Sequence, residues 1–141
     1  FTKDGMKAFV EGARAQYLVG EVFSTCGDEA AARQHWEAAA RGVDNYPQPD
    51  AVYVFLAAGR IAAGREDERR ARLEAALDSW RNRAAVGTNF PGPNAAGQGQ
   101  FLHALGREEE ARAKLREALL LPDKVMSHYL ARAALASEGL R

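Results

Sequence analysis

Three histidines and one cysteine have the widest chemical use in this sequence, as metal ligands, acid–base groups or nucleophiles. His35, His103 and His128 lie in separate segments, and no H-x-x-x-H or HExxH spacing places two of them on one helix face. Cys26 directly precedes Gly27, and the sequence indicates no base that would activate its thiol. We therefore interpret the histidines as surface or packing residues and Cys26 as a buried core residue, and we expect no metal and no cofactor.

Acidic and basic residues are paired with each other at helical spacing. The sequence shows no pair of carboxylates of the kind that acid–base catalysis uses. Four pairs place an acid four residues before a base, which is typical of a solvated helix face: Glu66/Arg70, Glu68/Arg72, Glu108/Arg112 and Glu110/Lys114. The Gly97-Gln98-Gly99 segment is not followed by Lys and Ser or Thr, so it is not a phosphate-binding loop. An enzyme is the least favoured class of function, because it needs a pocket with perturbed acids and a base.

The composition indicates a single globular domain built from helices. The chain has 141 residues, of which 47% are apolar, with 19 basic and 19 acidic side chains. This balance argues against a nucleic-acid partner, and the longest apolar run, residues 51–59, is about half of what a membrane helix needs. Ala occurs 29 times and β-branched residues only 12 times, which predicts an all-α fold with closely packed helices.

The sequence repeats itself. Residues 64–77 and 106–119 are identical at nine of 14 positions, and residues 27–40 are a weaker copy. Each copy opens with Gly and continues with acidic residues. Because Gly ends a helix in a left-handed turn and acids favour the first turn of the next helix, each copy is predicted to join two antiparallel helices.

A helical segment precedes each of these junctions. The predicted segments are residues 13–26, residues 51–63 after an N-cap at Asp50, and residues 95–105. A closing helix is predicted at residues 124–137, capped by Asp123. The expected organisation is one domain, residues 1–141, with units at 13–46, 50–83 and 93–121 and a closing helix within 123–138. Because the chain begins with Phe1, we expect a fragment of a larger protein. The sequence shows no signal-peptide region from which a compartment could be predicted.

Small and large residues recur at matching positions of the three units. Unit 1 has Gly20, Phe23, Gly27, Ala32, Trp36 and Ala39; unit 2 has Tyr53, Leu56, Ala57, Gly64, Leu73 and Ala76; unit 3 has Gly99, Leu102, Gly106, Ala111, Leu115 and Ala118. In this pattern residues 13–121 resemble the tetratricopeptide repeat (TPR) family. Unit 2 departs from it at Arg60, where a large apolar residue is expected, and at Arg69, where a small one is expected.

The resemblance implies an α-solenoid, a right-handed superhelix whose concave face is lined by the first helix of each unit. The family binds an extended peptide or a partner helix there and is seldom catalytic. Carried over by position, the groove candidates are Arg14, Tyr17, Glu21, Ser24, Thr25, Ala51, Val54, Ala58, Ile61, Ala62, Ala96, Gln100, His103 and Ala104. These positions hold almost no cations, so the basic clamp that some members use for a carboxyl-terminal peptide is not matched. The expected partner is a protein or peptide, with no nucleic acid and no membrane.

A segment rich in aromatic and basic residues, residues 79–94, is predicted to end the second helix of unit 2 and form a long loop. Trp80, Arg81, Arg83 and Phe90 could form an aromatic–Arg patch for a partner. Alternatively, Trp80 and Phe90 cover the gap between units 2 and 3. The second interpretation is favoured, because isolated aromatic residues usually pack in a core.

Two classes of function remain beside the enzyme. The leading one is a non-catalytic interaction scaffold that binds its partner on the concave face. The alternative is a structural spacer or self-association module, because neither end of the sequence shows the polar cap that keeps a solenoid soluble.

Overall fold

The computed structural model describes residues 12–42, 49–62, 64–87, 90–121 and 127–136; for residues 49–50 and 127–130 it describes the backbone only. Within these ranges the chain is all-α, as predicted, and no strand occurs. The helices are α2 (Ala13–Thr25), α3 (Glu29–Ala40), α4 (Pro49–Ile61), α5 (Glu66–Ala85), α6 (Pro91–Ala104), α7 (Glu108–Leu120) and α8 (Ser127–Ala136).

The three predicted junctions join α2 to α3, α4 to α5 and α6 to α7. Gly27, Gly64 and Gly106 have φ angles of 85°, 89° and 74°, in the region that side chains disfavour. The Asp28 carboxylate accepts a hydrogen bond of 3.0 Å from the Ala31 amide and so caps α3. The repeated Gly-plus-acid signature therefore marks helix–turn–helix junctions, as the sequence predicts.

Two helix starts differ from the prediction, both at a proline. α4 begins at Pro49, so Asp50 lies inside the helix and is not its N-cap. α6 begins at Pro91 instead of residue 95. Proline suits the first turn of a helix, because its fixed φ is already helical and its missing N–H has no partner there. The long loop predicted after Arg83 is therefore wrong, since α5 continues to Ala85 and α6 begins six residues later. The predicted cap Asp123 lies outside the described residues.

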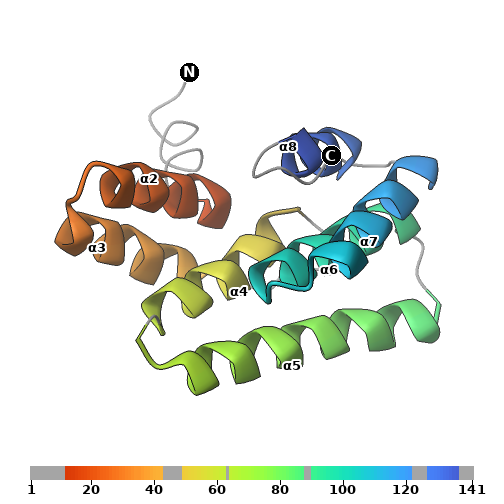
Figure 1. Cartoon of the computed structure of the whole chain (residues 1–141), viewed down its shortest axis with the longest axis horizontal. Coiled ribbons are helices and arrows are strands. Elements are labelled where there is room, and N and C mark those ends of the chain that lie inside the picture. Colours follow the sequence, from red (N-terminus) through yellow and green to blue (C-terminus); the bar gives the residue numbers. More distant parts are fainter. Residues whose placement is uncertain (1–11, 43–48, 63, 88–89, 122–126, 137–141) are drawn as a thin grey trace.

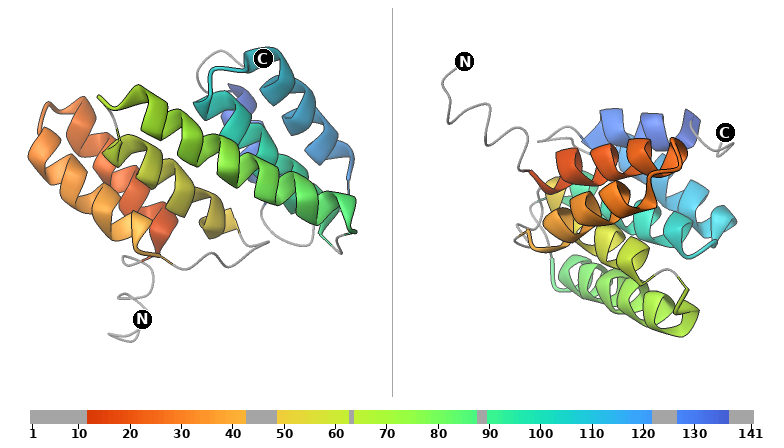
Figure 2. Two further views of the ribbon diagram at one scale, coloured as in Figure 1. Left: turned by 90° about the horizontal axis from the view of Figure 1, so that it is seen from below. Right: turned by 90° about the vertical axis from the view of Figure 1, so that its left-hand side faces the viewer.

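The helices pack in chain order, each against the next, and the first helices of successive units also touch: α2 packs against α4, α4 against α6, and α6 against α8. In Figures 1 and 2, α2 and α8 lie on the side of the molecule opposite the long helix α5, with α4 and α6 between them. From one side of the molecule to the other, the order is thus α2 and α8, then α4 and α6, then α5.

Small residues allow these close crossings. A Cβ at Gly20 would lie 2.5 Å from Nε1 of Trp36, and one at Gly99 would lie 2.6 Å from Cγ of Leu115. A Cβ at Gly97 would overlap the ring of Trp80. Since these three partners are buried, each glycine makes room for a large side chain of the neighbouring helix.

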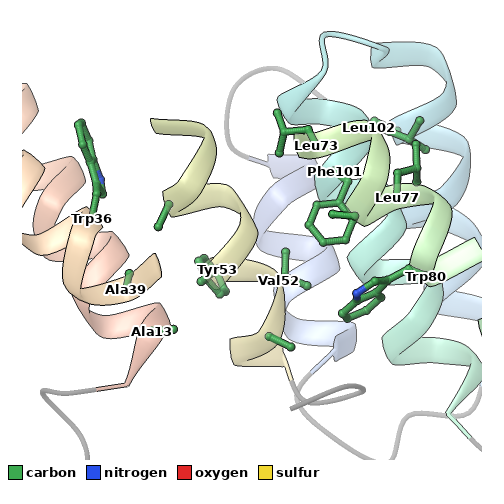
Figure 3. Close-up of a cluster of buried hydrophobic side chains, with 14 of the residues drawn as sticks. Ala13, Trp36, Ala39, Val52, Tyr53, Leu73, Leu77, Trp80, Phe101 and Leu102 are labelled. Atoms are coloured by element: carbon green, nitrogen blue, oxygen red, sulfur yellow. The ribbon is translucent and has the colours of Figure 1, made fainter. Parts of the chain in front are cut away.

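The larger of two buried clusters joins all three units. Trp80 of α5 is completely buried and packs edge-on against Phe101 of α6, with ring centroids 5.5 Å apart (Figure 3). Two polar side chains of α6 are buried beside this pair. Asn94 donates a 2.9 Å hydrogen bond to the Trp80 carbonyl, and Gln98 donates to the Asn94 side chain, so these amide groups are satisfied inside the core.

Candidate functional site

A hollow of about 790 Å³ lies among the first helices and α8. We call it the inner hollow. Its wall comes from α2 (Arg14, Tyr17, Leu18), α4 (Tyr53, Leu56, Gly59, Arg60), α5 (Glu66, Arg69, Leu73), α6 and its turn (Gln100, His103, Ala104, Leu105, Gly106), α7 (Glu108, Leu115) and α8 (Ala133, Ala134). A volume of this size, with a mostly apolar wall and a few polar groups, is typical of ligand-binding clefts.

Five of the predicted groove residues line the inner hollow: Arg14, Tyr17, Gln100, His103 and Ala104. Two others from unit 1 are engaged locally at the end of α2. The Ser24 hydroxyl donates to Glu29 at 2.7 Å, and the Thr25 hydroxyl donates to the Glu21 carbonyl at 2.9 Å. The carried-over positions therefore identify the wall in units 1 and 3, but not the far end of α2.

In unit 2 the predicted groove positions are wrong, because α4 is rotated relative to the carried-over register. Tyr53, Leu56 and Arg60 line the hollow. Val54 and Ile61 pack against the core, as Leu56 also does, but they are not part of the wall. Ala51 and Ala62 are buried, and Ala58 is half-buried and is not part of the wall. In unit 3, Ala96 is likewise buried and outside the wall. The signal for this rotation is in the sequence: Arg60 departs from the repeat pattern because it lies on the hollow side.

Arg60 links α4 to the first hairpin. Its guanidinium pairs with the Glu21 carboxylate at 2.6 Å and lies 5.6 Å from the centre of the Trp36 ring. Glu21, a predicted groove residue, thus contributes to the site through Arg60. Beside this pair the rings of Tyr17 and Tyr53 are 5.4 Å apart. Burial raises the pKa of the Tyr17 phenol above its ordinary value, and Glu21 raises it further, although Arg60 opposes the change.

Two further polar contacts join wall residues of α5, α6 and α7. Arg69 of α5 pairs with Glu66 at 2.9 Å and donates a hydrogen bond to the Ala104 carbonyl at the end of α6. The ring Nδ1 of His103 lies 3.1 Å from a carboxylate oxygen of Glu108. The second departure from the repeat, Arg69, is therefore explained: its side chain ties unit 2 to the end of the first helix of unit 3.

Arg14 differs from the other arginines of the wall. Its Nε is buried and has no hydrogen-bond partner among the described residues. No ion pair to its guanidinium occurs within the part of the chain that the structure describes. One wall arginine is thus partly withdrawn from water without a counter-charge.

The second predicted patch does not form a surface. Trp80 is completely buried between α5 and α6, so it is not available to a partner. Phe90 and Arg83 are half-buried at the facing ends of these helices, and Arg81 lies 3.8 Å from Glu110. The packing interpretation of Trp80, favoured from the sequence, is the one that its burial supports.

The remaining candidates for chemistry are His35, Cys26 and His128. The His35 ring stacks on Phe23 at 5.3 Å and hydrogen-bonds to Gln16 at 2.7 Å, so it packs between α2 and α3. The prediction of a buried Cys26 is wrong: the thiol is exposed, because α2 ends at Thr25 and leaves Cys26 at the turn. The side chain of His128 lies outside the described residues.

Two wider properties bear on the site. Among the described residues, no three His, Cys, Asp or Glu side chains are grouped so that they could hold a metal ion. None of the described helices combines the length and apolar character needed to cross a bilayer.

The charged helix faces pair partly as predicted. Glu68 pairs with Arg72 four residues on, whereas Glu66 and Arg112 pair with residues three positions away, Arg69 and Glu109. Both spacings lie on one helix face.

In comparison with known proteins, no family model matches the chain, and no curated protein or solved structure matches it. The TPR resemblance therefore stays a prediction.

Proposed function

We propose that this chain is a non-catalytic interaction scaffold, a TPR-like α-solenoid that binds a peptide segment or partner helix in the inner hollow. The observation that carries the proposal is the hollow itself, whose wall comes from the first helix of every unit. A stack of helical hairpins offers such a surface because each pair buries its apolar face against its neighbours and leaves one side lined by first helices.

The composition of the wall supports a peptide as occupant. Tyr17 and Leu56, which are half-buried, offer aromatic and aliphatic surface for apolar side chains, and the buried Tyr53 supports Tyr17 from behind. The Gln100 amide also lies in the wall, and an amide can both donate to and accept from a peptide backbone.

The test is selection of peptides on the purified protein from a displayed library of random 12-residue sequences. Peptides that bind the inner hollow should lose about tenfold or more in affinity for Tyr17→Ala and Gln100→Ala, which remove wall contacts. Gln34→Ala is the matched control, because Gln34 is an exposed helical glutamine of α3 away from the hollow. Failure to select any peptide, or equal binding by the wall variants and the control, would contradict the proposal.

A second candidate, self-association, rests on an exposed apolar face of α2 that meets the inner hollow at Leu18. Leu18, Val19 and Val22 of α2 are 44%, 38% and 63% exposed, and clustered exposed apolar residues mark contact surfaces. Sedimentation equilibrium tests this candidate: a dimer that Val22→Glu dissociates would favour it, and a monomer at high concentration would exclude it.

A further inference from the structure

Two of the three arginines that line the inner hollow are paired with carboxylates. Arg60 is paired with Glu21 and Arg69 with Glu66, and the ring of His103 lies beside Glu108. Arg14 is the wall arginine to which, among the described residues, no acid is paired. Arg14 therefore presents a positive charge that no described acid of the hollow pairs with.

The position of Arg14 makes the missing partner costly. Its Nε is shielded from water and lacks an acceptor among the described residues, and a buried donor without a partner is destabilising. Tyr17, one turn further along α2, adds a neutral aromatic surface to the wall beside it. An incoming anion would gain the attraction of Arg14 without displacing a carboxylate already bound there.

We infer that the occupant of the inner hollow presents an internal Asp or Glu side chain to Arg14, with apolar side chains next to it against Tyr17, Tyr53 and Leu56. This inference rests on the proposed function and adds the chemical class of the partner. The occupant is an acidic–apolar peptide segment rather than a basic one, because a cationic segment would face Arg14 without a counter-charge.

The test uses peptides selected as above and synthesised with acetylated and amidated ends, so that every negative charge comes from a side chain. Selected sequences should contain Asp or Glu beside apolar residues. Replacing that acid by its amide should lower affinity for the wild-type chain about tenfold. The same replacement should change affinity for Arg14→Gln by less than about twofold, because the partner charge is already absent.

Arg33→Gln is the matched control, since Arg33 is an exposed helical arginine of α3 outside the hollow. For this variant, replacing the peptide's acid by its amide should still lower affinity about tenfold. Helical circular dichroism checks that both variants fold. Arg14→Lys keeps the charge, so replacing the peptide's acid should still lower affinity for this variant, although by less than for the wild-type chain. If the same replacement lowers affinity for Arg14→Gln about tenfold, the inference is overturned.

Different results would contradict the proposed binding function and the assignment of an acidic partner to Arg14. Peptides that lose binding in Tyr17→Ala but need no acid would overturn only the assignment of Arg14. Peptides that bind only through a free carboxyl terminus, and not when amidated, would also overturn it. If no selected peptide depends on the wall of the hollow, both proposals fail.

Discussion

Replacing Gly99 by Ala tests whether small residues let the helices nest. The new Cβ would lie 2.6 Å from Cγ and 2.7 Å from Cδ2 of Leu115, and 3.3 Å from its backbone nitrogen. Leu115 is completely buried at this helix crossing, although it also borders the inner hollow, so its side chain or α7 must shift to admit the new methyl group. Overpacking of this kind costs about 1–3 kcal/mol, while Ala in place of Gly in a helix gains about 1 kcal/mol.

Gly59 provides the matched control, because it is also a buried glycine inside a first helix. A Cβ there would lie 3.6 Å from the Leu73 side chain, which is ordinary contact. Gly59→Ala should therefore stabilise the chain by up to about 1 kcal/mol through helix propensity alone. The propensity gain cancels in the comparison, so the two variants should differ by the overpacking cost, about 1–3 kcal/mol.

The assay is urea unfolding followed by far-ultraviolet circular dichroism, with the free energy of unfolding extrapolated to water. An unchanged m-value would show that both variants unfold from the same compact state. If Gly99→Ala proves as stable as Gly59→Ala, the close approach of α6 and α7 is not what positions the unit, and the reasoning is refuted.

Four further predictions concern individual residues. Gly97→Ala should lower the free energy of unfolding more than Gly99→Ala in the same urea assay, because the rigid and completely buried Trp80 ring has fewer ways to yield than a leucine. Asp28→Ala should cost about 1 kcal/mol by removing the cap of α3, measured by thermal unfolding. In an ultraviolet titration of the tyrosines, the Tyr17 phenol should ionise above the ordinary pKa of 10.0, because burial raises its pKa. The folded state therefore holds this proton more tightly than the unfolded state. The stability that the protonated phenol contributes is present below pH 10 and is lost as the pH rises through the folded-state pKa. Cys26 should react with a maleimide in the native chain nearly as fast as in urea, and slow native labelling would contradict its exposure.

The parts of the fold that depend on local chemistry could be predicted from the sequence. The glycines of the three junctions and the acids after them act within one turn of helix, so their spacing located the hairpins correctly. The abundance of Ala indicated close helix packing in the same way.

The parts that depend on neighbouring helices could not be predicted. The rotation of α4 depends on contacts with other helices: its buried residues join a core shared by all three units, and Arg60 pairs with Glu21 and lies over Trp36. The early start of α6 has a similar origin: a Pro- and Gly-rich segment reads as a loop, but it is buried against Trp80, and packing outweighs propensity. In the candidate site, Arg60 and Arg69 were visible only as departures from the repeat.

Mapping a selected peptide on the isotopically labelled chain by NMR tests the central claim most directly. The account predicts that amide shifts change at Arg14, Tyr17, Gln100 and Ala104, on the first helices around the inner hollow. Shifts confined to the outer faces of α3, α5 and α7, with these four residues unchanged, would contradict it.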